Sequence, residues 1–166
     1  MTIRTNEDYS HIDFTNKFTA FTDGSALKNS KDAPAGMACY FPKYKVLISK
    51  GMRCTNNVAE LEAMRTCLRY FVNHYINTEI PENTFYIFSD SEYTINAVSG
   101  KNKVNTNKEI IFECKRLIET INRKCEIKFM HVYSHTNAKD FVSVNNEIVD
   151  LAARNEANKM KDALEQ

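Results

Sequence analysis

Residues 17–25, KFTAFTDGS, combine an apolar run typical of a β-strand with an aspartate and a Gly-Ser turn signal. A second stretch of this kind is FYIFSDS, residues 85–91, in which Asp90 follows the apolar run. If the two strands lie side by side, Asp23 and Asp90 emerge at one edge of the sheet, where open α/β sheets place their ligand sites. Because neighbouring carboxylates repel each other, such a pair indicates a bound divalent metal.

The composition is that of one globular domain: 166 residues, 43% hydrophobic and 26% charged. With a formal net charge of +1, the protein as a whole is not positive enough to attract a polyanion such as a nucleic acid. Binding of a polyanion would therefore require a local basic patch or metal ions. Five scattered cysteines without a Cys-x-x-Cys pair argue against a disulfide framework or a zinc ribbon. No run has the length of a membrane span or a signal-peptide core. We expect a soluble, intracellular monomer with a polar tail over residues 1–16 and one domain over residues 17–162.

Hydrophobic periodicity predicts the element order βββαβααβα. The strands are expected over residues 17–23, 35–41, 44–49, 85–89 and 126–133. The helices are expected over residues 58–75 and 91–98, from the capping box at 106–109 to about 121, and from Asn145 or Asn146 to about 162. Residues 55–57, Thr-Asn-Asn, supply cap-type side chains ahead of the first helix, and residues 106–109 have the pattern of a capping box. Three early strands form an antiparallel meander, and the later two can pair in parallel with the first. The expected fold is an α/β mixed five-stranded sheet flanked by helices.

Two further carboxylates are placed unusually. Glu60 is followed three, four and eight residues later by apolar side chains, so it lies on or beside the buried face of its helix. Asp150 lies among apolar residues one turn into the last helix. A buried glutamate is costly unless it is paired or bound to a metal. Together with Asp23 and Asp90, these acids predict a site for hard cations, of which a pair can clamp the two reacting oxygens of a phosphodiester.

Taken singly, three of these acids have ordinary structural explanations. Asp23 can form a turn before a glycine, Asp90 can cap a helix, and Asp150 suits a helix N-terminus. Glu60 is the hardest to explain in this way, so the metal site rests on the four acids as a set.

The sequence resembles type 1 ribonuclease H over roughly residues 17–160. No single motif is decisive, but the ordered set is highly specific: TDGS at 22–25, RCTNNVAEL at 53–61, SDS at 89–91, HVYSH at 131–135 and NEIVD at 146–150. The predicted order of strands and helices is also that of this family. The resemblance therefore implies the ribonuclease H-like fold.

The resemblance implies an endonuclease that cuts the RNA strand of an RNA–DNA hybrid with two Mg²⁺ ions, which Mn²⁺ can replace, leaving 5′-phosphate and 3′-hydroxyl ends. Asp23 matches a carboxylate that bridges both ions. Glu60 and Asp90 match ligands of the ion on the leaving-group side, and Asp150 a ligand of the ion that activates water. His135 matches a histidine on the loop before the last helix, which assists product release or proton transfer.

Further positions match family contacts to the hybrid, which is distinguished by 2′-hydroxyls across a shallow minor groove. Arg53 and Thr55 match a pocket for a phosphate of the DNA strand. The other matching positions are Gly24, Ser25, Asn56, Asn57, Glu60 and Asn146. Helix capping is an alternative role for the three asparagines.

Three features depart from the family pattern. The chain has no tryptophan, whereas many relatives use one to support the DNA-binding channel. Residues 99–108 are short and carry only three lysines where some relatives insert a basic helix and loop. So few charges predict weak binding with a shallow salt dependence. Glu92 stands where several relatives have an uncharged side chain.

Two other functions remain open at this point. One is a structure-selective DNA nuclease or strand-transfer enzyme of the same fold, against which the 2′-hydroxyl-reading positions argue. The other is a non-catalytic nucleic-acid-binding module, which has no need of four metal-binding acids. A zinc site made by His131 and His135 is not expected, because residues four apart on a strand are too distant to share one ion.

Overall fold

The computed structural model describes residues 9, 11–133 and 139–164. Its elements are β1 (Phe18–Ala26), β2 (Pro34–Phe41), β3 (Val46–Arg53), α1 (Asn56–His74), the short 3₁₀ helix η2 (Pro81–Asn83), β4 (Thr84–Ser89), α2 (Glu92–Val98), α3 (Lys108–Asn122), β5 (Glu126–His131) and α4 (Phe141–Leu164). Apart from η2, this is the predicted order.

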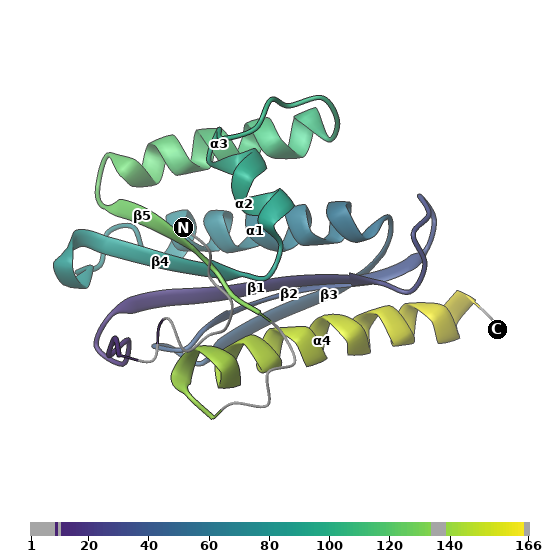
Figure 1. Ribbon diagram of the computed structural model, residues 1–166, viewed down its shortest axis with the longest axis horizontal. Coiled ribbons are helices and arrows are strands. Elements are labelled where there is room, and N and C mark those ends of the chain that lie inside the picture. Colours follow the sequence, from purple (N-terminus) through teal and green to yellow (C-terminus); the bar gives the residue numbers. More distant parts are fainter. Residues whose placement is uncertain (1–8, 10, 134–138, 165–166) are drawn as a thin grey trace.

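The strands form one mixed sheet in the order β3-β2-β1-β4-β5. β2 is antiparallel to β1 and β3, whereas β4 is parallel to β1 and β5. The predicted five-stranded sheet, with a meander followed by two parallel strands, is confirmed. Figure 1 shows α1 and α3 on one side of the sheet and α4 on the other.

Both faces of the sheet are buried, and successive residues of β1 serve opposite faces. Phe18 and Ala20 belong to the larger core cluster, which also contains buried apolar residues of α1 and α3, such as Leu68 and Ile111. Phe21 belongs to a second cluster, which contains Val149 of α4. A strand alternates the direction of its side chains, so burial on both faces requires a nearly continuous apolar run. This explains why residues 17–21 lack the apolar–polar alternation of a surface strand.

β1 is longer than predicted, and Asp23 lies within it rather than at its end. The parallel pairing of β1 with β4 ends where Thr22 faces Ser89, but the antiparallel pairing with β2 continues to Ala26. The turn signal after Asp23 is therefore overridden by hydrogen bonding to β2. Asp23 still lies beside the point at which β4 leaves the sheet, as the metal-site prediction requires.

The prediction for the start of α4 was wrong. The helix begins at Phe141, several residues before the expected asparagine cap. The Oδ2 atom of Asp140 accepts a hydrogen bond from the backbone N–H of Ser143 at 3.2 Å, in the manner of an N-cap. Asn145 and Asn146 lie inside the helix and are buried.

The prediction of a capping box at the start of α3 was also wrong. That of a cap within residues 55–57 is confirmed at Thr55, whereas Asn56 and Asn57 lie inside α1. Asn107 precedes α3 in the left-handed conformation (φ 55°) and makes no side-chain cap. Its Nδ2 atom instead donates to the hydroxyl of Tyr93 at 3.0 Å. At α1, the Oγ1 atom of Thr55 accepts from the N–H of Val58 at 3.2 Å.

Part of the expected N-terminal tail packs onto the domain. Phe14 is 1% exposed and makes edge-to-face contacts with Tyr86 and Phe88, with ring centroids 5.3 and 5.1 Å apart. Tyr9 is also buried and belongs to the same cluster. These contacts differ from the expectation of a wholly polar tail, because aromatic side chains within it cover the β4 face of the sheet.

All five cysteines lie in the described part of the chain, and each is buried with a free thiol. The prediction that they form no disulfide framework is confirmed. Within the described residues, every helix is too short or too polar to cross a membrane.

Candidate active site

Three of the predicted metal ligands meet at one edge of the sheet. Asp23 comes from the middle of β1, Glu60 from the first turns of α1 and Asp90 from the residue after β4. One carboxylate oxygen from each lies within 4.8 Å of the others, close enough for all three to hold one ion. Asp23 and Glu60 are 3% and 5% exposed. The predicted convergence of these acids is thus seen in the structure.

Gly24 is the reason that α1 can bring Glu60 so close to β1. Its backbone N–H donates to Oδ1 of Asp23 and to Oε1 of Glu60, both at 2.9 Å. A Cβ atom on this residue would lie 2.3 Å from the backbone nitrogen of Glu60, a distance that atoms do not tolerate. At the same end of the sheet, Oδ1 of Asn56 accepts from the N–H of Ala26 at 3.1 Å. Hydrogen bonds from the backbone of β1 to two side chains of α1 therefore hold the start of this helix against the end of β1.

The electrostatics of this cluster favour a cation. Burial raises the pKa of Asp23 well above its ordinary value, and the charges of Asp90 and Asp150 raise it further. Burial and the same kind of repulsion, here from Asp23 and Asp90, raise the pKa of Glu60. The pKa of Asp90 is also raised, chiefly by burial. An all-oxygen donor set whose members destabilise one another as anions fits a hard divalent ion such as Mg²⁺.

Asp150 approaches the cluster from α4, on the opposite side of the sheet from α1. It is 8% exposed and lies outside the group of three oxygens, but its charge acts on both Asp23 and Asp90. Its Oδ2 atom accepts from the guanidinium of Arg154 at 3.1 Å. The fourth predicted ligand is therefore a neighbour of the cluster, close enough for its charge to raise the pKa values of Asp23 and Asp90.

The predicted substrate-binding residues fall into two environments. Arg53, Asn56 and Asn57 are exposed around the start of α1, where the Nε–H of Arg53 donates to the carbonyl of Asp32 at 3.4 Å. Asn146, in contrast, is 2% exposed on α4, one turn before Asp150. Its Oδ1 atom has no hydrogen-bond partner among the described residues.

Two other predicted substrate contacts, at Gly24 and Ser25, lie in β1 beside the cluster, Gly24 buried and Ser25 half-buried. Thr55 is half-buried and serves as the cap of α1. His135 lies outside the described residues.

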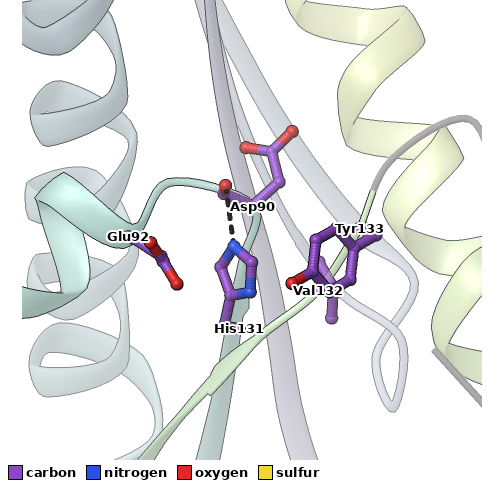
Figure 2. A pocket seen from close by; sticks show the side chains of 5 residues that line it. All are labelled: Asp90, Glu92, His131, Val132 and Tyr133. Carbon is purple, nitrogen blue, oxygen red and sulfur yellow. Dashed lines mark hydrogen bonds between the residues drawn. The ribbon is translucent and has the colours of Figure 1, made fainter. Parts of the chain in front are cut away.

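Sequence reasoning missed the contact between His131 and Asp90. A cavity of about 380 Å³ beside the cluster is lined by Asp90, Glu92, His131, Val132 and Tyr133 (Figure 2). In it, the Nε2 atom of His131 lies 3.2 Å from the backbone carbonyl oxygen of Asp90. The sequence carried no signal for this contact, because it depends on the register of the folded sheet, in which His131 ends β5 directly opposite Ser89, the residue before Asp90.

The comparisons with known proteins agree with this geometry. The family model described as RNase H matches residues 15–158, so the chain belongs to the RNase H family. No curated protein matched the sequence. The ribonuclease H class of enzyme predicted from the sequence is confirmed at the level of the family.

Solved structures show the same fold at low sequence identity. LC11-RNase H1, isolated from compost, has a TM-score of 0.66 and 22% identity, with 87% of this chain and 98% of that chain covered. In complex with an RNA/DNA hybrid, LC11-RNase H1 has a TM-score of 0.59, 24% identity and coverage of 84% and 98%. The N-terminal RNase H domain of a Mycobacterium tuberculosis protein has a TM-score of 0.64, 16% identity and coverage of 89% and 98%.

Proposed function

We propose that this protein is an endonuclease that hydrolyses the RNA strand of RNA–DNA hybrids with two Mg²⁺ ions, for which Mn²⁺ can substitute, and leaves 5′-phosphate and 3′-hydroxyl ends. The observation that carries the proposal is the meeting of three carboxylates, the buried Asp23 and Glu60 and the half-buried Asp90, in a chain of the RNase H family. A neighbour of the same fold was solved with an RNA/DNA hybrid, which supports this substrate.

The residues divide the chemistry between them. Asp23, Glu60 and Asp90 would hold one ion, and Asp150 together with Asp23 would hold the other. When bound, such a pair lowers the pKa of the attacking water and stabilises the leaving oxygen. The N–H of Gly24 orients the carboxylates of Asp23 and Glu60 before any ion arrives, since it donates to both. This preorganisation avoids a rearrangement at the moment of binding.

We assign the hybrid's contacts to the surface around the start of α1 and to the residues beside the cluster. Arg53 and Thr55 would receive a phosphate of the DNA strand. Gly24, Ser25, Asn56, Asn57 and Asn146 would contact the hybrid at its minor groove or nearby. His135 would assist product release or proton transfer. The protein is proposed to act as an intracellular monomer.

The experiment that tests this function is cleavage of an end-labelled RNA–DNA hybrid, compared with RNA duplex, DNA duplex and single strands. We expect cutting of the RNA strand in the hybrid alone, in Mg²⁺ and not in EDTA. Cutting of DNA would instead support the structure-selective nuclease. Binding of hybrid without cutting in either Mg²⁺ or Mn²⁺ would support the non-catalytic module.

Asp23→Asn tests the metal site within this function. The amide keeps the shape of the side chain but removes the charge that would bridge two ions, so we expect cleavage to fall by at least about 100-fold, in the range seen when one electrostatic stabiliser is lost. Hybrid binding should persist, because phosphate and groove contacts lie elsewhere. Normal cleavage by Asp23→Asn in Mg²⁺ would refute the assignment.

A further inference from the structure

We propose that His131 is a positioning residue for Asp90: its imidazole holds the backbone of the turn that presents the Asp90 carboxylate to the metal site. The inference rests on the proposed metal site and adds to it a residue on β5, the strand at the far edge of the sheet. His131 belongs to none of the metal-ligand or substrate positions assigned above.

The first step of the argument is the direction of the hydrogen bond. Nε2 of His131 lies 3.2 Å from the carbonyl oxygen of Asp90. Because a carbonyl oxygen only accepts, Nε2 is the donor and carries a proton whether the ring is neutral or charged. The bond therefore does not depend on the ring's charge.

The second step is where the strand pairing stops. β4 and β5 remain in register as far as Ser89 and His131, and the N–H of Val132 donates to the carbonyl of Ser89 at 3.0 Å. Asp90 is the next residue and lies beyond the end of β4. Its carbonyl is held by a side chain of β5, so the imidazole extends the link between the two strands by one residue.

The third step is that the bond leaves the carboxylate free to bind an ion. Figure 2 shows the carbonyl of Asp90 directed at the His131 ring and its carboxylate directed away from that ring. From the other side, the N–H of Ser91 donates to Oγ of Ser89 at 3.1 Å, and Oγ of Ser91 caps α2 through the N–H of Thr94. The turn is thus held at the residues before and after Asp90, and His131 holds Asp90 itself.

His131 is in turn held from the N-terminal segment. The hydroxyl of Tyr9 donates to the backbone carbonyl of His131 at 2.6 Å, and the ring of Tyr9 packs edge-on against Phe88 with centroids 6.0 Å apart. The ring of Tyr133 stands nearly perpendicular to the imidazole of His131, with ring centroids 4.9 Å apart. A side chain fixed in this way can transmit a precise position, as support for a metal site requires.

The physical need for such a tether follows from the repulsion within the cluster. Asp23, Glu60 and Asp90 disfavour one another as anions, so a loosely held Asp90 would move outward when the site is empty and would have to be drawn back by the ion. Outer partners of metal ligands typically contribute about 10–100-fold to metal affinity. The same range is expected for His131.

The test is Mg²⁺ binding measured by calorimetry on the full chain without nucleic acid. His131→Phe keeps a flat ring beside Tyr133 but has no donor, and we expect its Kd for Mg²⁺ to rise about 10-fold. His131→Gln places an amide N–H near the position of Nε2, and we expect its Kd to return to within about 3-fold of wild type. Equal binding by His131→Phe and wild type, or failure of His131→Gln to restore binding, would overturn the proposal.

A matched control separates positioning from general destabilisation. Ile127→Ala opens a cavity at the other end of β5, where Ile127 packs against the larger core cluster, and should lower the melting temperature without changing the Kd for Mg²⁺. If Ile127→Ala weakens Mg²⁺ binding as much as His131→Phe, the effect is one of stability and the proposal fails. Failure of the metal site itself is distinguishable: Asp23→Asn would then bind Mg²⁺ as wild type does.

Discussion

Asp23 and Glu60 are acids that the fold buries almost completely, and this has a cost when no ion is bound. Burial is the main cause that raises their pKa values, and the charges of neighbouring carboxylates add to it. A carboxyl whose pKa is raised on folding stabilises the fold below its unfolded-state pKa, and that stabilisation is lost as the pH rises through the folded-state pKa. The metal-free protein therefore loses stability from this site as the pH increases from about 4.

Asp23→Asn should remove this loss. Without metal at neutral pH, we expect a higher free energy of unfolding for Asp23→Asn than for wild type, and the difference should shrink as the pH falls toward 4, where the unfolded-state carboxyl also becomes protonated. Mg²⁺ at about 100 times its Kd should add about 2.7 kcal/mol to wild type and little to the variant. Urea unfolding at several pH values measures both effects. Parallel pH curves for the two proteins would contradict the assignment.

At the scale of elements, glycines set how closely the helices approach the sheet. A Cβ atom on Gly36 of β2 would lie 2.2 Å from the backbone oxygen of Ala153 in α4. On the neighbouring strand, a Cβ atom on Gly51 would lie 3.1 Å from the flexible end of the Met160 side chain. At Gly36, the nearest part of α4 is rigid backbone. At Gly51, the nearest part of α4 is a side chain that can move.

This difference predicts unequal costs for the same substitution. Gly36→Ala should lower the free energy of unfolding by about 3 kcal/mol, because α4 as a whole must shift. Gly51→Ala should cost less than about 1 kcal/mol, because the end of Met160 can rotate away. Denaturant unfolding of both variants is the measurement. Similar losses in the two would show that α4 is not packed on β2 as described.

The starts of α3 and α4 show why element boundaries were the weakest predictions. Residues 106–109 fit the capping-box pattern, yet the side chain of Asn107 donates to Tyr93 of a different helix. Asn145 and Asn146 are good caps by type, but both are buried within α4. Asp140 takes the capping role. A cap depends on one or two hydrogen bonds, so a competing contact elsewhere in the fold can move the boundary.

At the scale of the whole molecule, the second core cluster is completed by residues before β1. Phe14 packs between the sheet and the start of α4, with contacts to Tyr86, Phe88 and Phe141. The structural unit therefore includes part of the segment that composition alone assigns to a tail.

Phe14→Ala should lower the free energy of unfolding by about 3 kcal/mol or more, the usual cost of removing a buried phenylalanine. Asn16→Ala, an exposed position two residues later, is the control and should change it by less than about 0.5 kcal/mol. Chemical denaturation followed by circular dichroism compares the two. If the segment were a detachable tail, the two variants would behave alike.

The reactivity of the five buried thiols measures whether the core around them is folded. Burial raises the pKa of Cys39 and Cys114 to about 12 and that of Cys54 to about 11, so almost no thiolate is present at pH 8. We expect slow reaction with Ellman's reagent in the folded protein and rapid reaction of all five thiols in denaturant. A thiol that reacts rapidly without denaturant would indicate local opening around it.

Local sequence patterns predicted the sheet, the order of the helices and the acids at Asp23, Glu60 and Asp90. Burial on both faces of β1 requires a continuous apolar run, and burial on one face of α1 requires apolar residues at helical spacing, so both can be recognised in the sequence. Asp150 was also singled out from its apolar neighbours in the last helix, and the resemblance of the ordered motifs then added the family. Contacts between residues that are distant in the sequence produce no local pattern of this kind. The bond from His131 to Asp90, the anchoring of His131 by Tyr9 and the close approach that requires Gly24 exist only once separate elements are packed together.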